Sequence, residues 1–472
     1  MTIEEPSTTG TGLERTLGVP QIVFMVVAVA APLTVFAGLI PLMLGTGNGI
    51  GTPVNFLIVG VVLLLFTVGY SAMTPEVRSA GAFYSYVQRG LGTTAGLGAA
   101  ALALVTYSVL VIAVSAYLGA AAATVVENFT GVEVPWWLLS GAGLVLIGVL
   151  GYRNVEVSAR VLGVLLVAEI GIVTVVDLAI LVRGGASGLS AEPFSWSAFT
   201  SGAVGTGLMF AVFGFVGFEA TAVFRSEAKD PDRTIPRATY IAVLVIAVVY
   251  AVSSWAMIIG LGVDRASGLA AADPEGLTPG LATRYVGHVA HDVVQVLLVT
   301  SFFACILTAH NVVSRYLFAL GRQEAVPSKL GAAHPVHRSP HAASVVTSVV
   351  IGALVALTAF AGLDPVTEVY AWFGGAGTLG IVALLTLTSA AVVVHFRGQR
   401  TASLWRCTVA PALALVALGA ILVLVVINFE LLVGSRALAN VFLGVIGASF
   451  ITGLVWAVTL RRRRPDVYAA FE

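Results

Sequence analysis

Charged side chains are scarce in this chain: Asp, Glu, Lys and Arg make up only 10% of its 472 residues, and 24 basic residues balance 24 acidic ones. Because Lys and Arg do not outnumber Asp and Glu, the chain lacks the positive charge that binds a phosphate backbone, and no nucleic-acid partner is expected. Cysteine is nearly absent as well. Cys305 and Cys407 form no ligand spacing, so the sequence predicts no metal site, no cofactor and no disulfide framework.

Hydrophobic residues take the place of the missing charge. They make up 58% of the chain, and the mean hydropathy is +0.98. An ordinary soluble protein is far less apolar. A soluble enzyme and a receptor with a single anchor are therefore both excluded, and the chain is expected to reside in a lipid bilayer.

Twelve apolar stretches approach the length of about 20 residues that a membrane-spanning helix needs. Their approximate bounds are 20–44, 54–72, 96–124, 136–152, 160–182, 204–224, 238–262, 289–320, 343–361, 370–395, 408–428 and 437–460. The first stretch is too long and too weakly flanked by positive charge for a cleaved signal, so it is expected to remain in the mature protein. The predicted fold class is an all-α integral membrane protein with twelve transmembrane helices.

The basic residues predict the orientation, because Lys and Arg are retained on the cytoplasmic side of short loops. With the N-terminus inside, all but four of the 24 basic residues fall on the cytoplasmic face. The four exceptions are Arg183, Arg265, Arg284 and Arg436. The tails, residues 1–18 and 461–472, are therefore both predicted to be cytoplasmic, in a multi-pass protein of the plasma (inner) membrane.

Two of the twelve stretches look interrupted near the middle. In the first, Pro32 removes a backbone donor, and the helix is expected to open around Ala31 to Thr34. In the sixth, Gly214 and Gly217 flank two residues and predict a break over Phe213 to Gly217. Taken singly, a kink or close helix packing would explain each feature. Broken backbone in a bilayer is tolerated only where it is buried in protein or lines a cavity.

The two breaks lie five spans apart, which predicts two five-helix inverted repeats, 19–183 and 200–396, with discontinuous helices 1 and 6 around a midplane site. Two further helices follow within 407–460. The N–H groups that begin a half-helix attract an anion, and the C=O groups that end one attract a cation, so such a gap suits a zwitterion. The aromatic residues that could line it are Phe210, Phe213, Phe215 and Phe218.

The segment GFEATAVFRSEAKDPDRTIPRA, residues 217–238, resembles the amino acid, polyamine and organocation (APC) transporter superfamily. Those transporters carry a glycine-aromatic-acid element in the sixth helix, an acidic residue, a Lys-x-Pro-like turn and an Ile-Pro-Arg-Ala start to the seventh helix. The matching positions are Gly217 to Glu219, Glu227, Lys229 to Pro231 and Ile235 to Ala238.

Two more segments resemble the same family, MTPEVRSAGAFYSYVQRGLG at residues 73–92 and NVVSRYLFALGRQEAVP at residues 311–327. They depart from its usual pattern at Ala80, Gln323 and Glu324. The resemblance implies a leucine-transporter-like 5+5 fold and alternating access. It also implies uptake or exchange of a small-molecule substrate, an amino acid or a related amine.

In that family the α-carboxylate of the substrate docks at the break of the first helix and the amine docks at the break of the sixth. Carried over by position, the substrate-binding residues are Ala31, Pro32, Leu33, Thr34 and Val35 at the first break and Phe213, Gly214, Phe215 and Gly217 at the second. The family's usual Gly-Ser-Gly element is absent from the first break. Fewer glycines give a carboxylate less room near the backbone, so a substrate without a carboxylate stays open.

Four ionisable residues fall within predicted spans, where a charge costs roughly 2.5–3.5 kcal/mol on insertion scales. Asp177 lies near the outer end of its span, where its side chain can reach the membrane interface, and it is assigned a structural role. His310 is expected to make a plain interhelical hydrogen bond. Glu219 directly follows the second break and is predicted to gate transport, by tying the sixth helix to a neighbour or by exchanging a proton.

Glu169 is the predicted coupling residue. In relatives without sodium coupling, a lysine follows an Ala-Arg or Thr-Arg pair at a fixed interval and takes the place of a sodium ion. Counted from Arg160, that interval ends at Glu169. A carboxylate in the fifth helix without a lysine to pair with is expected to bind and release a proton, which predicts proton-coupled uptake. A sodium-coupled carrier and an exchanger of a cationic amine or polyamine stay open as alternatives.

Enzymes and channels are the competing classes. No HExxH or GxSxG element accompanies a suitable histidine, so no zinc site, no activated serine and no catalytic residue is assigned. A channel would need a continuous polar stripe or a repeated filter, whereas the polar groups here cluster at two breaks. The sequence therefore predicts a secondary active transporter, and a channel is the more remote alternative.

Overall fold

The structure is a computed structural model. It describes residues 17–77, 82–153, 159–219, 221, 228–337, 339–397 and 403–469. Two positions of the family resemblance, Ala80 and Glu227, lie outside these ranges. Within them the secondary structure is helical, and the β contact is an isolated bridge between Leu17 and Ala228.

Eleven segments of the described chain are long and apolar enough to cross a bilayer. They are Val19–Thr46, Gly49–Glu76, Thr93–Thr130, Trp136–Arg153, Gly163–Val182, Pro231–Leu261, His288–Arg322, His341–Phe360, Pro365–His395, Trp405–Val433 and Arg436–Arg463. Each of them falls on one of the predicted stretches. The expected all-helical membrane class is therefore confirmed.

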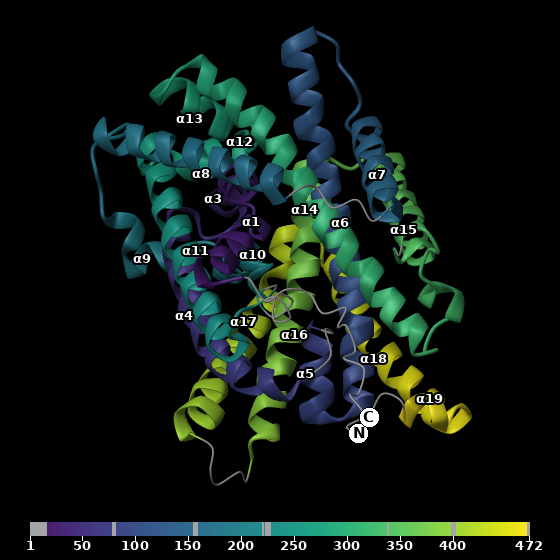
Figure 1. Ribbon diagram of the computed structural model, residues 1–472. Helices are drawn as coiled ribbons and strands as arrows, with labels where there is room; N and C mark the ends of the chain where they lie inside the picture. Colours follow the sequence, from purple (N-terminus) through teal and green to yellow (C-terminus); the bar gives the residue numbers. More distant parts are fainter. Residues whose placement is uncertain are drawn as a thin grey trace, which may run out of the picture.

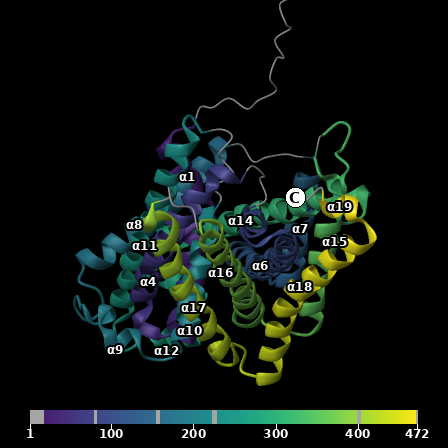
Figure 2. The ribbon, with the colours of Figure 1, turned by 90° about the horizontal axis from the view of Figure 1, so that it is seen from below.

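The long helices pack together in one bundle, most of them lengthwise, with α8 lying across its upper part in Figure 1. They are α4 (Thr52–Met73), α6 (Thr93–Thr130), α7 (Trp136–Arg153), α8 (Ala159–Val182), α11 (Pro231–Leu261), α14 (His288–Arg322), α15 (His341–Phe360), α16 (Gly374–His395), α17 (Ala410–Val433) and α18 (Arg436–Arg463). In Figure 2, α6 is seen almost along its axis with α7, α14, α16 and α18 around it, and these helices contact α6.

Small residues allow the closest of these approaches. A Cβ added at Gly453 of α18 would lie only 2.7 Å from the Cα of Gly98 in α6. Contacts of this kind are typical of membrane helices, which pack through small side chains because lipid is as apolar as leucine.

Shorter helices lie at both ends of the bundle. At its lower end in Figure 1 are α5 (Ala82–Leu91) and α19 (Pro465–Ala469), and at its upper end are α12 (Ala266–Ala272) and α13 (Leu277–Tyr285). The remaining short elements are α9 (Trp196–Phe199), η2 (Gly49–Gly51), η3 (Thr74–Glu76), η4 (Glu192–Phe194), η6 (Ser328–Gly331), η7 (Pro365–Phe373) and η8 (Trp405–Val409).

The first span is interrupted, but not where the proline was expected to open it. Helix α1 (Val19–Val29) ends before Ala31, which has a left-handed φ of 46°. Pro32 then begins a second helical run, α2 (Pro32–Thr34), η1 (Val35–Leu39) and α3 (Ile40–Thr46). Proline is well suited to a first helical position, since its missing N–H would have no intrahelical partner there. The predicted opening over Ala31 to Thr34 is thus confined to Ala30 and Ala31.

The sixth predicted span is a half-helix in the described chain. Helix α10 (Val204–Phe215) has 12 residues, or about 18 Å, which is too short to cross a bilayer. Phe213 to Phe215 remain in α10, so the break predicted over Phe213 to Gly217 begins only at Val216, next to Gly217, whose φ is 109°. Since Ala220 and residues 222–227 are not described, the described chain establishes eleven spans and this half-helix.

The half-helices α1 and α10 begin at different ends of the bundle. Next to the start of α1, the N–H of Lys229 donates to the carbonyl of Leu17 over 3.0 Å. Next to the start of α10, the N–H of Ala203 donates over 3.1 Å to the carbonyl of Gly47, which follows the end of α3. The two half-helices therefore run toward each other, and their carboxyl ends lie inside the bundle.

Candidate functional site

Tyr250 of α11 links the two breaks. Its hydroxyl donates to the carbonyl of Ala30 over 3.0 Å, at the interruption of the first span. Its ring centroid lies 6.5 Å from that of Phe215, and a Cβ at Gly214 would lie 3.5 Å from the same ring. The structure therefore brings the predicted residues of the first and sixth helices to a common region.

Through Ser301, Glu169 of α8 is linked to the first break. Its Oε2 accepts a hydrogen bond from Ser301 Oγ of α14 over 2.9 Å. Ser301 Oγ also lies 3.0 Å from Thr34 Oγ1. Glu169 is 5% exposed. One buried polar cluster thus joins α8, α14 and the first residues after the break.

Glu219 occupies a second polar cluster, beside the sixth-helix break. Tyr107 of α6 donates to Glu219 Oε1 over 2.7 Å, and the backbone N–H of Gly217 donates to Oε2 over 2.9 Å. The side chain is 9% exposed. Glu219 therefore connects the unwound backbone at Gly217 to α6. A hydrogen bond between the sixth helix and a neighbouring helix is one of the two roles that the sequence predicts for Glu219.

Aromatic rings from four helices meet near the breaks. Tyr370 of η7 lies 5.8 Å from Phe213, 4.9 Å from Tyr117 of α6 and 6.2 Å from Phe302 of α14, measured between ring centroids. Tyr117 also donates to the carbonyl of Ala37 over 3.2 Å. Phe213 is only partly buried, so of the predicted phenylalanines it is the one that joins this aromatic group.

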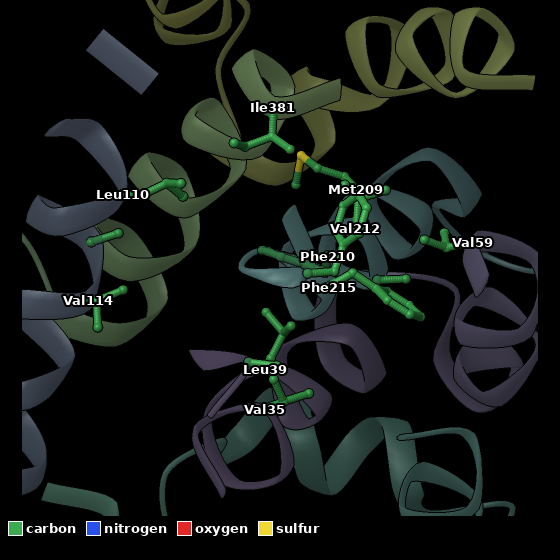
Figure 3. Close-up of a cluster of buried hydrophobic side chains, with 14 of the residues drawn as sticks. Val35, Leu39, Val59, Leu110, Val114, Met209, Phe210, Val212, Phe215 and Ile381 are labelled. Carbon is green, nitrogen blue, oxygen red and sulfur yellow. The ribbon is translucent and has the colours of Figure 1, made fainter. Parts of the chain in front are cut away.

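The other predicted apolar residues mainly pack. Figure 3 shows Phe210 and Phe215 of α10 near Leu39 and Val35, in a cluster of buried hydrophobic side chains. Phe218 packs edge-to-face on Phe66, at 5.9 Å between centroids. These contacts hold the half-helices against each other.

Four side chains near the breaks have no signature in the sequence: Tyr107, Tyr117, Tyr250 and Ser301. Tyr107, Tyr250 and Ser301 bond residues at or beside a break, and Tyr117 bonds Ala37 in the helical run that follows the first break. All four come from regular helices that are distant along the chain. Among residues that fill ordinary helical positions, nothing in the local pattern distinguishes them from neighbours that only pack.

Asp177 and His310 both contact a neighbouring helix. Asp177 is 7% exposed and accepts a hydrogen bond from Ser253 of α11 over 2.5 Å, a contact that fits the structural role expected of it. His310 Nε2 lies 2.9 Å from Ser348 Oγ of α15, which confirms the interhelical hydrogen bond.

A group of carboxylates lies in the segments outside the spans at the α12 and α13 end of the bundle. Burial, together with the neighbouring carboxylates of Asp364 and Asp273, raises the pKa of Glu275 to about 7. An unfolded glutamate titrates near pH 4.3. A raised folded pKa means that the folded state loses stability as the pH rises from about 4.5 through 7.

Replacing Glu275 with glutamine is therefore expected to raise the melting temperature at pH 8 by a few degrees and to change it little at pH 5. The substitution removes the ionised, partly desolvated carboxylate that is present only at the higher pH. Thermal unfolding of the purified protein in detergent at both pH values measures this. Glu133 is exposed, and Glu133→Gln serves as the control because it should change the melting temperature by the same small amount at pH 5 and at pH 8. An equal gain in melting temperature at both pH values for Glu275→Gln would contradict the raised pKa of Glu275.

Half-helices that meet inside a bundle of membrane helices are the arrangement found in secondary transporters. The chain matches the model of the family described as amino acid permease over residues 21–465, and it belongs to that family. The resemblance to the APC superfamily is confirmed. The family and its named relatives are transporters, not enzymes.

Several transporters are similar to the chain. The low-affinity putrescine importer PlaP of Escherichia coli is 25% identical over 346 residues, which are 71% of this chain and 73% of PlaP. The branched-chain amino acid permease BcaP of Bacillus subtilis is 24% identical over 385 residues, 75% of this chain and 76% of BcaP. An uncharacterized transporter of Rhizobium meliloti is 28% identical over 289 residues, 58% of each chain.

Proposed function

We propose that the protein is a secondary active transporter that takes up amino acids or related amines across the plasma membrane by alternating access, driven by protons. Its fold is the leucine-transporter-like 5+5 inverted repeat with twelve transmembrane helices, of which the first and sixth are discontinuous. Substrate binds between the two breaks. The relatives favour this substrate class, because one imports a diamine and another is a permease for branched-chain amino acids.

The observation that carries the proposal is the position of Glu169. A buried carboxylate that accepts from Ser301, whose hydroxyl also lies 3.0 Å from Thr34 Oγ1, connects a scaffold helix, α8, to the interrupted first span. If its protonation changes, these contacts change strength, and the first span is held more tightly in one conformation than in the other. Such a difference in stability between two states is what coupling requires.

The opposed half-helices support the inverted repeat. Helices α1 and α10 begin at different ends of the bundle and finish at the two breaks, as repeats of opposite topology require. Contacts of the two terminal regions favour their common location on the cytoplasmic side. Leu17 pairs with Ala228 in the loop before α11, and Tyr468 of α19 hydrogen-bonds Thr94 at the start of α6; both loops are basic-rich and predicted to be cytoplasmic.

Uptake into proteoliposomes tests this function. With an inward proton gradient and no sodium, uptake of labelled amino acids and amines is expected to saturate with substrate concentration and to collapse when a protonophore removes the gradient. A rate that rises linearly with the concentration gradient would identify a channel instead. Uptake that requires sodium, or that needs internal substrate and ignores the proton gradient, would replace proton symport by the sodium-coupled or exchange alternative.

A further inference from the structure

We propose that the protein binds the headgroup of an anionic phospholipid where α14 and α18 end, in a cavity in which the carboxylate of Glu324 now pairs with the binding arginine, Arg464. The site lies apart from the two breaks, because none of the residues that line the cavity belongs to them. Lipid binding there does not depend on which solute is transported or on what drives the transport.

The cavity has a volume of about 290 Å³ and lies between the segment that follows α14 and the end of α18. Both helices belong to segments that are long and apolar enough to cross a bilayer, His288–Arg322 and Arg436–Arg463. The cavity therefore lies where two spans end, at the depth of the lipid headgroups. Its lining residues are Glu324, Ala325, Val326, Pro327, Ser328, Leu460 and Arg464.

Lipid can reach this cavity from the side of the bundle. Figure 2 shows α18 at the rim, together with α15 and α19. Helix α18 exposes Ile451, Val455 and Val458. Exposed aliphatic side chains of a membrane helix contact acyl chains, because the bilayer core contains no water. A phospholipid beside α18 can therefore keep its chains against the bundle and place its headgroup at the cavity.

The two segments that form the cavity carry an excess of positive charge. Within the described residues 321–331 and 460–469, six side chains are basic and two, those of Glu324 and Asp466, are acidic. Basic pockets between membrane helices at the level of the headgroups bind anionic lipids. Phosphate oxygens also accept the paired N–H groups of an arginine, as a carboxylate does. The basic residues are Arg322, Lys329, Arg461, Arg462, Arg463 and Arg464.

Glu324 has a strained backbone. Its φ is 55°, and within the described chain the other residue besides glycine with a positive φ is Ala31, at the first break. The guanidinium of Arg464 pairs with the Glu324 carboxylate and also donates to the Glu324 carbonyl over 3.4 Å. Strain of this kind persists where surrounding contacts maintain it, and it is concentrated at ligand clamps and switches.

A headgroup phosphate can replace Glu324 on Arg464 at small cost. The side chains of Arg464 and Glu324 are 46% and 57% exposed, and an ion pair in contact with water stabilises a fold only slightly. The phosphate would keep the charge-assisted hydrogen bonds of Arg464, and the strained segment at Glu324 could relax. It would also gain the attraction of the neighbouring arginines, which lie within a few residues of Arg464.

Binding of phosphatidylglycerol and of the zwitterionic phosphatidylcholine to the full-length protein in detergent tests the site. Native mass spectrometry gives the dissociation constant of the first lipid bound. Arg464→Gln is expected to weaken phosphatidylglycerol binding at least ~5-fold, because the charge-assisted hydrogen bonds are lost. Glu324→Gln is expected to tighten it at least ~3-fold, because the competing carboxylate loses its charge. A gain in affinity cannot result from a misfolded variant.

Asp466→Asn and Arg461→Gln are the matched controls. Asp466 is an exposed acid beside the same arginines, and Arg461 lies over the ring of Tyr468, 5.9 Å from its centroid. Neither residue lines the cavity. Each control is expected to change the dissociation constant less than ~2-fold, because solvent and salt screen charges outside the cavity. Changes as large as those of the cavity variants would show that the charge of the whole segment binds lipid, and they would overturn the assignment of the cavity.

The identity of the ligand is tested with the same protein. Phosphatidylglycerol is expected to bind at least ~10-fold more tightly than phosphatidylcholine, and inorganic phosphate at the same concentration should leave that preference unchanged. Equal affinities for the two lipids would overturn the proposed headgroup site. Displacement of phosphatidylglycerol by inorganic phosphate would overturn it as well, because the cavity would then recognise a soluble anion.

Discussion

Glu169→Gln is expected to abolish uptake driven by a proton gradient, with a loss of at least ~10-fold, while exchange of labelled for unlabelled substrate continues. Glutamine has nearly the size of glutamate, and its carbonyl can still accept from Ser301. It cannot change charge. The variant therefore keeps the contacts that hold the first span and loses the group that we propose to bind and release the proton.

The measurement compares three conditions for wild type and variant in sodium-free proteoliposomes: an imposed pH gradient, no gradient, and counterflow with internal substrate. Asp177→Asn is the control, because Asp177 is the other buried carboxylate of α8 and contacts Ser253 rather than a break. It should retain gradient-driven uptake. Sodium-dependent uptake by the wild type, or undiminished gradient-driven uptake by Glu169→Gln, would reject the coupling role.

Most of the helical bundle is predictable from the sequence, because one physical rule sets the length of each membrane helix. Helix α7 (Trp136–Arg153) and helix α18 (Arg436–Arg463) begin and end within three residues of the predicted 136–152 and 437–460. Backbone polar groups cannot be left unpaired in lipid, so an apolar run must continue as helix until it reaches the interface.

The details of the breaks are less predictable, since they depend on contacts between distant segments. The sequence locates the first break at Pro32, yet the helix is interrupted one residue earlier. Ala31 adopts a left-handed conformation where Tyr250 supplies a donor for the neighbouring Ala30 carbonyl and Ser301 contacts the Thr34 hydroxyl. Such partners come from helices more than 130 residues away, and no local pattern encodes them.

The candidate site shows the same division between local and distant information. Glu219 and Gly217 are two positions apart in the sequence, and the hydrogen bond between them lies within a short motif. The third member of that cluster, Tyr107, lies 112 residues away and is one of 12 tyrosines. Composition and spacing do not single it out, because only the packing of α6 against the broken helix brings its hydroxyl to the carboxylate.

Gly217→Leu is expected to abolish substrate binding, with an affinity loss of more than ~100-fold, while the protein stays folded in the membrane. Gly217 has a φ of 109°, a conformation that a side chain makes costly by about 1–3 kcal/mol. Its amide also donates to Glu219 over 2.9 Å. A leucine here would turn the backbone away from that carboxylate and would place a bulky group at the proposed site. Thermal stabilisation by substrate and saturable uptake measure the loss.

Gly131→Leu separates this effect from the general cost of replacing a glycine with positive φ. Gly131 has a φ of 71° at the end of α6, and a Cβ there would meet nothing within 4 Å. The control variant therefore carries comparable backbone strain far from either break and should bind substrate normally. Wild-type affinity in Gly217→Leu would reject a site between the breaks. Equal losses in both variants would do so as well, because they would mean that strain anywhere in the fold, rather than the geometry of the sixth-helix break, controls binding.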